Sequence, residues 1–390
     1  MTSLQLDALR IRNREILPIV QGGMGVGVSA HRLAGAVAEA GGMGTLSSVD
    51  LRRHHADLLL STARCRDKAP IDAVNLIALD REIRAARERA GGRGLIAVNI
   101  MRAVSEYPAY VRQACESGAD AIVVGAGLPL DLPELVADFP DVALIPILSE
   151  SRAVGLVVKR WMRKGRLPDA IIIEHPRYAG GHLGAAKLEE VTDPRFDFTR
   201  VIPEIHALFD QLGIERGRIP LIAAGGINSP LRVNAAFSTG ASAVQVGTAF
   251  AVTEEGDAHP EFKRVLAEAR PQDIVTFMSV AGLPARAVRT PWLETYLERE
   301  ASKQRRARER PCTLGFECLA QCGLRDGLSK AGQFCIDHHL AAALRGDIKH
   351  GLFFRGSEPT PFGSVIRPVA DLVDYLLGRS TFAEGSLAEA

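Results

Sequence analysis

Residues 220–250 read PLIAAGGINSPLRVNAAFSTGASAVQVGTAF and contain a complete structural unit. Two short apolar runs, 220–224 and 243–246, are separated by a segment with helical periodicity at 231–239. Such an arrangement is typical of a βαβ unit, because parallel strands need a long crossover connection. Glycine follows each apolar run directly. The stretch therefore predicts two parallel strands that end in tight, glycine-containing loops.

The same alternation of apolar runs and helical segments extends toward the N-terminus. Further apolar runs lie at 17–20, 43–47, 95–100, 121–125, 143–148 and 170–174. Helical patterns lie between the runs, at 29–40, 80–90, 107–117, 132–138, 151–164 and 200–212. Ser29 is the expected N-cap of the first of these helices. Eight strands, each followed by a helix, match a (β/α)8 TIM barrel, a fold of about 250 residues. An open, doubly wound α/β sheet is the main alternative, but eight successive units favour closure.

The composition narrows the class of protein. The 390 residues are 47% hydrophobic and 24% charged, which are globular values, so a disordered chain is excluded. A formal net charge of +1 provides no field that would attract nucleic acid or an anionic membrane. The N-terminus lacks the basic flank and apolar core of a signal peptide, and no run of about 18 apolar residues occurs. We expect a cytoplasmic protein that acts on a small molecule, and leave a homo-oligomer open.

The pattern of the chain changes after about residue 270, where the βα rhythm ends. We predict a barrel over residues 1–270 and a smaller helical extension over residues 271–390, which includes a cysteine segment and a helix near 334–344. The run SKQRRARER at 302–310 is basic. Because the rest of the chain carries no excess positive charge, a solvated helical face is favoured over a binding patch.

Glycines follow four of the predicted strands directly. They occur as Gly22-Gly23-Met24-Gly25, Gly125-Ala126-Gly127, Gly225-Gly226 and Gly247-Thr248. The loops after the strands of a barrel meet at its C-terminal face, where small residues let backbone N–H groups approach a ligand. The last two loops are a common phosphate site in barrels, and we predict a cofactor phosphate there. Ordinary tight turns are the alternative, and the spacings fit neither a dinucleotide fingerprint nor a P-loop.

The segment after the sixth predicted strand, EHPRYAGGHLG at 174–184, contains the best candidate for acid–base chemistry. His182 lies between glycines on a loop expected at the barrel mouth, and an imidazole titrates near neutral pH. His182 is therefore the predicted catalytic base. His175 and Tyr178 compete for the same role, and a histidine that only hydrogen-bonds the turn is the alternative without chemistry.

Five motifs in this order and spacing resemble the nitronate monooxygenase family, formerly called 2-nitropropane dioxygenases. They are PIVQGGMG (18–25), VN (98–99), AGGHLG (179–184), LIAAGGI (221–227) and GASAVQVGTAF (240–250). The family also includes FMN-dependent enoyl reductases and NAD(P)H:quinone reductases. The resemblance covers about residues 15–255 and implies a TIM barrel that binds FMN at its mouth.

The resemblance also implies roles for individual residues. Gly23, Met24 and Asn99 would contact the flavin ring, and Gly181 would lie along the cofactor. Gly225, Gly226, Gly247 and Thr248 would hold the phosphate, with Gln245 nearby. His182 matches the family's catalytic base, which removes the proton α to the nitro group. The full predicted FMN site comprises Gly22, Gly23, Met24, Asn99, Gly125, Ala179, Gly180, Gly181, Ala224, Gly225, Gly226, Gln245, Gly247 and Thr248.

The expected activity is FMN-dependent oxidation of alkyl nitronates or similar acidic carbanions by O2. One departure from the family concerns Tyr178, which stands directly before AGGH where the oxidases usually have an acidic residue. An NAD(P)H-dependent reductase of a quinone or an enoyl thioester is therefore an alternative, in which His182 would protonate or orient the acceptor. A non-catalytic flavin or metal sensor is a third hypothesis.

Four of the six cysteines lie within a short segment, as Cys312-x5-Cys318-x3-Cys322-x12-Cys335. Thiolates at this density can converge on one metal centre. The last two spacings look like the C-x2-C-x3-C-x11-C motif of flavin barrels related to old yellow enzyme, which implies a [4Fe–4S] cluster. Structural zinc and free buried thiols are the alternatives. We expect this part of the chain to lie over or beside the barrel mouth.

Overall fold

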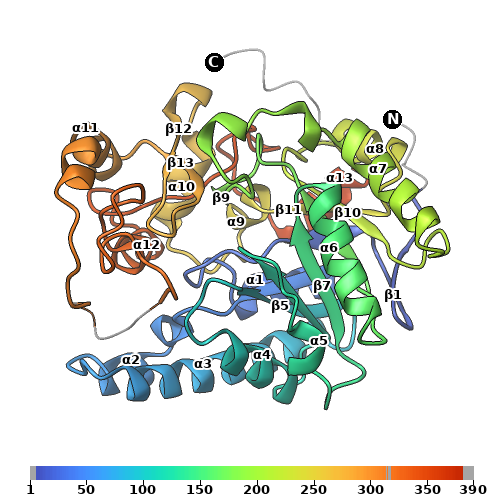
Figure 1. Ribbon diagram of the computed structural model, residues 1–390, viewed down its shortest axis with the longest axis horizontal. Coiled ribbons are helices and arrows are strands. Elements are labelled where there is room, and N and C mark those ends of the chain that lie inside the picture. Colours follow the sequence, from blue (N-terminus) through green and yellow to red (C-terminus); the bar gives the residue numbers. More distant parts are fainter. Residues whose placement is uncertain (1–5, 313, 315–317, 381–390) are drawn as a thin grey trace.

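The computed structural model describes residues 6–312, 314 and 318–380. Within these ranges, eight parallel strands close into a barrel in the order β10-β11-β3-β4-β5-β6-β7-β8 (Figure 1). Their bounds are β3 Ile19–Gln21, β4 Met43–Ser47, β5 Leu95–Met101, β6 Ala121–Gly125, β7 Ala143–Leu148, β8 Ile171–Glu174, β10 Leu221–Ala224 and β11 Ala243–Val246. The predicted TIM barrel is confirmed, and the open sheet is excluded by the pairing of β3 with β11.

Helices cover the outside of the barrel and bury apolar faces against its strands. They are α1 His31–Glu39, α2 Ala56–Ser61, α3 Lys68–Ala90, α4 Tyr107–Glu116, α5 Leu132–Leu135, α6 Ser151–Met162, α7 Phe198–Gln211, α8 Pro230–Ser238 and α9 Thr248–Ala251. Short 3₁₀ turns occur at Leu51–His54, Leu188–Glu190, Pro194–Phe196 and Pro271–Asp273. The prediction for α3 was twelve residues too short at its start. Pro70 lies in the first turn of α3, where its missing N–H costs no hydrogen bond.

The predicted cap of α1 was wrong. Ala30 occupies the N-cap position, and the carboxylate of Asp257 accepts hydrogen bonds from the backbone N–H groups of Ala30, Arg32 and Leu33 at 2.8, 3.1 and 3.1 Å. The hydroxyl of Ser29 instead accepts a hydrogen bond from the N–H of Met24 at 2.8 Å. Ser29 therefore fixes the glycine loop after β3, and a distant carboxylate satisfies the helix.

Side chains inside the barrel follow the two-residue alternation of β-strands. In β8, Ile171 and Ile173 pack toward the helices, whereas Ile172 packs into the barrel interior. A hairpin of β1 (Leu9–Ile11) and β2 (Arg14–Ile16) closes the N-terminal end of this interior. By the same alternation, the last inward residues of the strands face the open C-terminal end. These residues are Ser47, Asn99, Gly125, Ile147, Glu174, Ala224 and Gln245.

The chain beyond the barrel adds a small sheet and four helices within the described residues. The helices are α10 Pro260–Glu268, α11 Pro291–Arg305, α12 Ile336–Leu344 and α13 Val369–Leu376. Strands β12 (Ile274–Met278) and β13 (Pro284–Val288) pair with each other, and β13 also pairs with β9 (Gly181–His182). The loop after β8, which contains the predicted base, is thereby joined to this sheet. In Figure 1, β12, β13, α11 and α12 gather on one side of the molecule.

Helix α13 returns to the barrel and packs against α1, α8 and α9. Leu372 and Leu376 lie in the same buried cluster as the apolar residues between barrel and helices. The division at residue 270 stays a prediction. The basic run starts in the last turns of α11, and Arg305, Arg306, Arg308 and Arg310 are exposed. Of the helices described, none combines the length and apolar character needed to cross a membrane.

Candidate functional site

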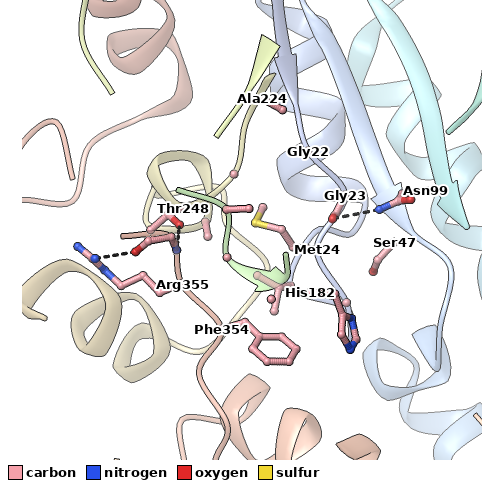
Figure 2. Close-up of a pocket in the computed structure, with 18 of the residues that line it drawn as sticks. Gly22, Gly23, Met24, Ser47, Asn99, His182, Ala224, Thr248, Phe354 and Arg355 are labelled. Carbon is pink, nitrogen blue, oxygen red and sulfur yellow. Dashed lines mark hydrogen bonds between the residues drawn. The ribbon is translucent and has the colours of Figure 1, made fainter. Parts of the chain in front are cut away.

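A cavity of about 300 Å³ opens at the C-terminal end of the barrel (Figure 2). This volume is within the range of small-molecule sites. The cavity brings together every residue that the sequence analysis assigned to catalysis or to FMN: Gly22, Gly23, Met24, Asn99, Gly125, Ala179, Gly180, Gly181, His182, Ala224, Gly225, Gly226, Gln245, Gly247 and Thr248. Residues from four loops and from the inner faces of the strands thus share one concave surface.

The loop after β3 lies directly against β5. The side-chain amide of Asn99 donates a hydrogen bond to the carbonyl of Gly23 at 3.2 Å. A Cβ atom on Gly23 would lie only 2.3 Å from the Cβ of Asn99, so this contact requires glycine. The Oδ1 atom of Asn99 is buried and has no hydrogen-bond partner among the described residues. Since buried polar atoms are normally paired, this oxygen is suited to a donor on a bound ligand.

The loops after β10 and β11 form the opposite end of the cavity. Gly225 and Gly226 have φ values of +101° and +77°, and a Cβ on Gly226 would lie 2.9 Å from the ring of Tyr178. At Gly247 a Cβ would meet only the sulfur of Met24, at 3.9 Å, and would otherwise project into open space. The hydroxyl of Thr248 accepts a hydrogen bond from the N–H of Gly356 at 3.0 Å. Because Gly225, Gly226 and Gly247 are glycines, a ligand can approach the backbone of the two loops without meeting a side chain there.

Arg355 lies beside this end of the cavity and was not found from the sequence (Figure 2). Its Nε and Nη1 atoms donate to the carbonyls of Leu266 and Gly356 at 2.8 and 2.9 Å. The residue comes from the segment beyond the barrel, where no motif marked it. The guanidinium contacts Gly356, whose N–H donates to Thr248, so its positive charge favours a phosphate at this end of the cavity.

His182 lies at the other side of the cavity, and its position is fixed from two directions. Its Nε2 atom is 3.0 Å from the hydroxyl oxygen of Ser279, in the turn between β12 and β13, and its ring centroid is 5.9 Å from that of Phe354. Burial lowers the pKa of His182 to about 4. The imidazole is therefore neutral at pH 7, the form that can accept a proton.

The two competitors for the role of base have other positions. His175 is buried, its Nε2 atom lies 3.1 Å from a carboxylate oxygen of Asp197, and its ring packs edge-on against Tyr178 and Phe198. His175 is not among the residues that line the cavity, whereas Tyr178 is. The ring of Tyr178 packs against the backbone at Gly226. The structure thus separates a packed histidine from one that faces the cavity.

Glu174 is a titratable cavity residue that the sequence analysis did not assign to the site. It is the last residue of β8 and lines the cavity. Burial raises its pKa to about 7, although Arg286 favours the carboxylate. The strand alternation could have identified this residue, as well as Ser47 and Ile147, because each lies two residues beyond an inward-facing position.

The segment beyond the barrel supplies an apolar wall, which we define as Leu319, Ile336, Leu340, Leu352 and Phe354. Asp337 also lines the cavity there, but it is buried and receives a hydrogen bond from Arg53 at 2.8 Å. The expectation that this part of the chain reaches the barrel mouth thus agrees with the lining of the cavity.

A comparison with protein families decides the family of the chain. The sequence model of the family described as nitronate monooxygenase matches residues 11–377. The chain belongs to the nitronate monooxygenase family. This match confirms the expected kind of enzyme, an oxidoreductase that resembles nitronate monooxygenase. It also extends well past residue 255, where the recognised motifs of the family ended.

Individual relatives agree with this family membership. The chain is 27% identical over 285 residues to a probable nitronate monooxygenase of Bacillus subtilis, covering 71% of this chain and 78% of the relative. It is 25% identical over 284 residues to a nitronate monooxygenase of Pseudomonas aeruginosa, covering 70% and 76%.

Solved structures with the same fold include FabK from Thermotoga maritima, with a TM-score of 0.64, 23% identity and coverage of 93% of this chain and 92% of that one. Another is a nitroalkane oxidase from Streptomyces ansochromogenes, with a TM-score of 0.63, 20% identity and coverage of 93% and 95%.

The described residues of the cysteine segment give no support to the predicted metal site. Cys318 lines the cavity, but Cys312, Cys322 and Cys335 do not. Burial raises the pKa of Cys318 and raises that of Cys335 to about 11. Among the residues with described positions, no group of three or more His, Cys, Asp or Glu side chains could hold a metal ion. The predicted iron–sulfur cluster and its zinc alternative are therefore not supported.

Proposed function

We propose that the protein is an FMN-dependent nitronate monooxygenase that oxidises alkyl nitronates, or similarly acidic carbanions, with O2. The observation that carries the proposal is a single cavity with a glycine-lined end suited to a phosphate and a neutral imidazole at its other side. The relatives named nitronate monooxygenase support the same reaction. A small-molecule substrate and a cytoplasmic location belong to the same proposal.

FMN fits the residues at both ends of the cavity. Gly225, Gly226, Gly247 and Thr248 would hold the phosphate, because all four line the cavity, the space beside Gly247 is open, and Arg355 lines the same end. At the other end, the unpartnered Oδ1 of Asn99 suits an N–H group of the flavin ring. When bound, FMN supplies the redox chemistry, which the protein side chains cannot provide.

His182 would handle the proton of the substrate. Its Nε2 atom is within hydrogen-bond distance of Ser279, so the second ring nitrogen, Nδ1, is left to act on the substrate. A neutral imidazole can remove the proton from the carbon next to a nitro group when the substrate arrives as the neutral nitroalkane. Ser279 would act as a positioning residue, because its hydroxyl fixes the orientation of the ring.

The alternatives from the sequence are less well supported. Reduction of a quinone or an enoyl thioester by NAD(P)H has its counterpart in the likeness to FabK, but at 23% identity that likeness concerns the fold. A non-catalytic sensor would have no need for a neutral histidine that faces the same cavity as the glycine loops.

An anaerobic titration of the FMN-loaded protein tests the proposal. We expect the nitronate of a simple nitroalkane to bleach the flavin absorption, and NADH or NADPH to leave it unchanged in the same time. Bleaching by NADH or NADPH and not by the nitronate would establish the reductase instead. His182→Ala should lower kcat/KM for the neutral nitroalkane by about 100-fold or more, the usual effect of losing a general base. The loss should be much smaller for the preformed nitronate, which has no α proton to remove.

A further inference from the structure

We propose that the substrate of this site carries an uncharged alkyl chain on its reacting carbon, and that this chain packs against the apolar wall. The inference rests on the proposed function and adds the substrate class to it. It predicts a preference for longer alkyl nitronates and discrimination against nitronates that carry a carboxylate.

The apolar wall is the inner face of a packed hydrophobic cluster. Leu319, Ile336 and Leu352 are 3%, 6% and 0% exposed, and they belong to a cluster that also contains Phe277 and Phe334. Leu340 and Phe354 pack onto the same cluster from the cavity side. Because packed side chains hold their positions, the wall presents a defined apolar surface to the cavity and not a mobile one.

The position of His182 places this wall where a substrate chain would lie. The ring of Phe354 is 5.9 Å from the imidazole of His182, measured between centroids. Ser279, which contacts the imidazole, is followed by Val280, a member of the same hydrophobic cluster. Figure 2 shows Phe354 and His182 on the same side of the cavity, with Thr248 and Arg355 on another. A substrate whose reacting carbon lies at His182 thus has the wall within its reach.

The charges around the cavity argue against a second anionic group on the substrate. Arg355 is the one Arg or Lys side chain among the lining residues that the structure describes. Its guanidinium donates to the carbonyls of Leu266 and Gly356, beside Thr248 and not at the wall. The charged group at the wall is Asp337, which is paired with Arg53. A carboxylate placed against the wall would lose its hydration and gain no cationic partner.

A series of nitronates tests the inference. We expect kcat/KM to rise by about fourfold for each methylene added between two and six carbons, the effect of burying one methylene group. The nitronate of 3-nitropropionate should react about 100-fold more slowly, in kcat/KM, than the nitronate of 1-nitropropane, which has the same carbon number and no carboxylate, because the carboxylate would be buried without a partner. A flat or falling series, or equal rates for the carboxylate-bearing nitronate, would overturn the inference.

Variants test whether the apolar wall causes the dependence of kcat/KM on chain length. Leu340→Ser should flatten the dependence of kcat/KM on chain length, because the added methylene groups would then meet a polar side chain and not an apolar one. Leu60→Ser is the matched control, since Leu60 lies on α2 with 75% of its surface exposed. If Leu340→Ser weakens FMN binding and leaves the dependence on chain length unchanged, the wall holds the cofactor and the inference is wrong. If no nitronate bleaches the flavin, the proposed function itself fails.

Discussion

At the scale of single residues, the glycines of the cavity divide into two kinds. A Cβ on Gly23 would collide with Asn99 at 2.3 Å, whereas a Cβ on Gly247 would enter open space in the cavity. We therefore expect Gly23→Ala to destabilise the fold. Gly247→Ala should fold normally but lose FMN affinity by about tenfold or more, because the added methyl group occupies the space proposed for the phosphate.

The measurements are FMN binding, followed through the quenching of flavin fluorescence, and thermal unfolding of the FMN-free protein. If Gly247→Ala binds FMN as tightly as the unsubstituted protein does, the proposed position of the phosphate is wrong. The free energy of unfolding of Gly247→Ala should differ from that of the unsubstituted protein by less than about 0.5 kcal/mol, the usual range for substitutions away from packed contacts.

Glu174 gives the site a predicted pH dependence. Its pKa is raised to about 7, so the residue is a neutral acid below pH 7 and a carboxylate above it. A negative charge at the end of β8 would repel an anionic nitronate. We expect KM for a nitronate to rise by about tenfold as the pH passes from 6 to 8, equivalent to ~1.4 kcal/mol.

Glu174→Gln removes the titrating group and keeps the size of the side chain. KM for the variant should change much less between pH 6 and 8 than KM of the unsubstituted protein, and any remaining change is expected from Asp337, which also lines the cavity and whose pKa burial raises to about 7. Burial places the pKa of His182 near 4, well below this range, so its titration does not contribute. A pH dependence that persists undiminished in Glu174→Gln would assign it to another group.

The residues of the site were predictable to the extent that motifs marked them. Local motifs marked the glycine loops and His182, and these residues line the cavity, whereas their roles in catalysis and cofactor binding stay predictions. Ser279, which contacts His182, and Arg355, which lines the cavity, were not predictable, because both lie far along the chain from any motif and come to the site only through the pairing of β13 with β9 and the return of the chain to the barrel. Glu174 could have been predicted from the sequence, since the alternation of inward and outward side chains along β8 identifies its inward position.

At the scale of elements, the N-terminus of α1 depends on a residue more than 200 positions away. Asp257 accepts hydrogen bonds from the N–H groups of Ala30, Arg32 and Leu33. Asp257→Ala should lower the free energy of unfolding by about 1–2 kcal/mol, because these donors lose their acceptor. Urea unfolding measures the change.

Ser29→Ala provides the contrast to Asp257→Ala. Its hydroxyl contacts the N–H of Met24 and not the helix, so we expect this variant to alter the loop after β3 and the FMN affinity. A larger stability loss in Ser29→Ala than in Asp257→Ala would restore Ser29 as the functional cap.

The strands were predicted better than the helices for a physical reason. Strands β4, β6, β7 and β11 have the predicted bounds, because each is buried on both faces and appears as a short run that contains no charged residue. The first turns of helix α3 carry apolar Ala73 and Ile77 on the exposed face and polar Asn75 on the buried face, so the amphipathic pattern that would have marked them is blurred. Cysteine spacing was misleading because burial of thiols and ligation of a metal produce the same sequence pattern.

At the scale of the whole molecule, the last described helix joins the extension to the barrel. Leu372 and Leu376 of α13 lie in the core between the barrel and its helices, and α13 packs between α1 and α8. The residues of the apolar wall and Arg355 complete the cavity from the same part of the chain. Both the core and the site therefore depend on residues from each side of position 270.

We predict that the two parts unfold together, and the two tryptophans make this testable. Trp161 lies on α6 of the barrel, and Trp292 lies on α11 of the extension. In the variants Trp161→Phe and Trp292→Phe, fluorescence reports on one part at a time. The urea midpoints of the two reporters should coincide, since a shared core gives a cooperative transition.

Leu376→Ala should then lower the free energy of unfolding by about 2–4 kcal/mol, the cost of a cavity at a fully buried leucine. Both fluorescence reporters should move by the same amount, because α13 contributes to the core of the barrel although it is part of the extension. If only the Trp292 signal moved, or if the two midpoints separated, residues 271–390 would form an independent folding unit, and the cavity would be an interface between two domains.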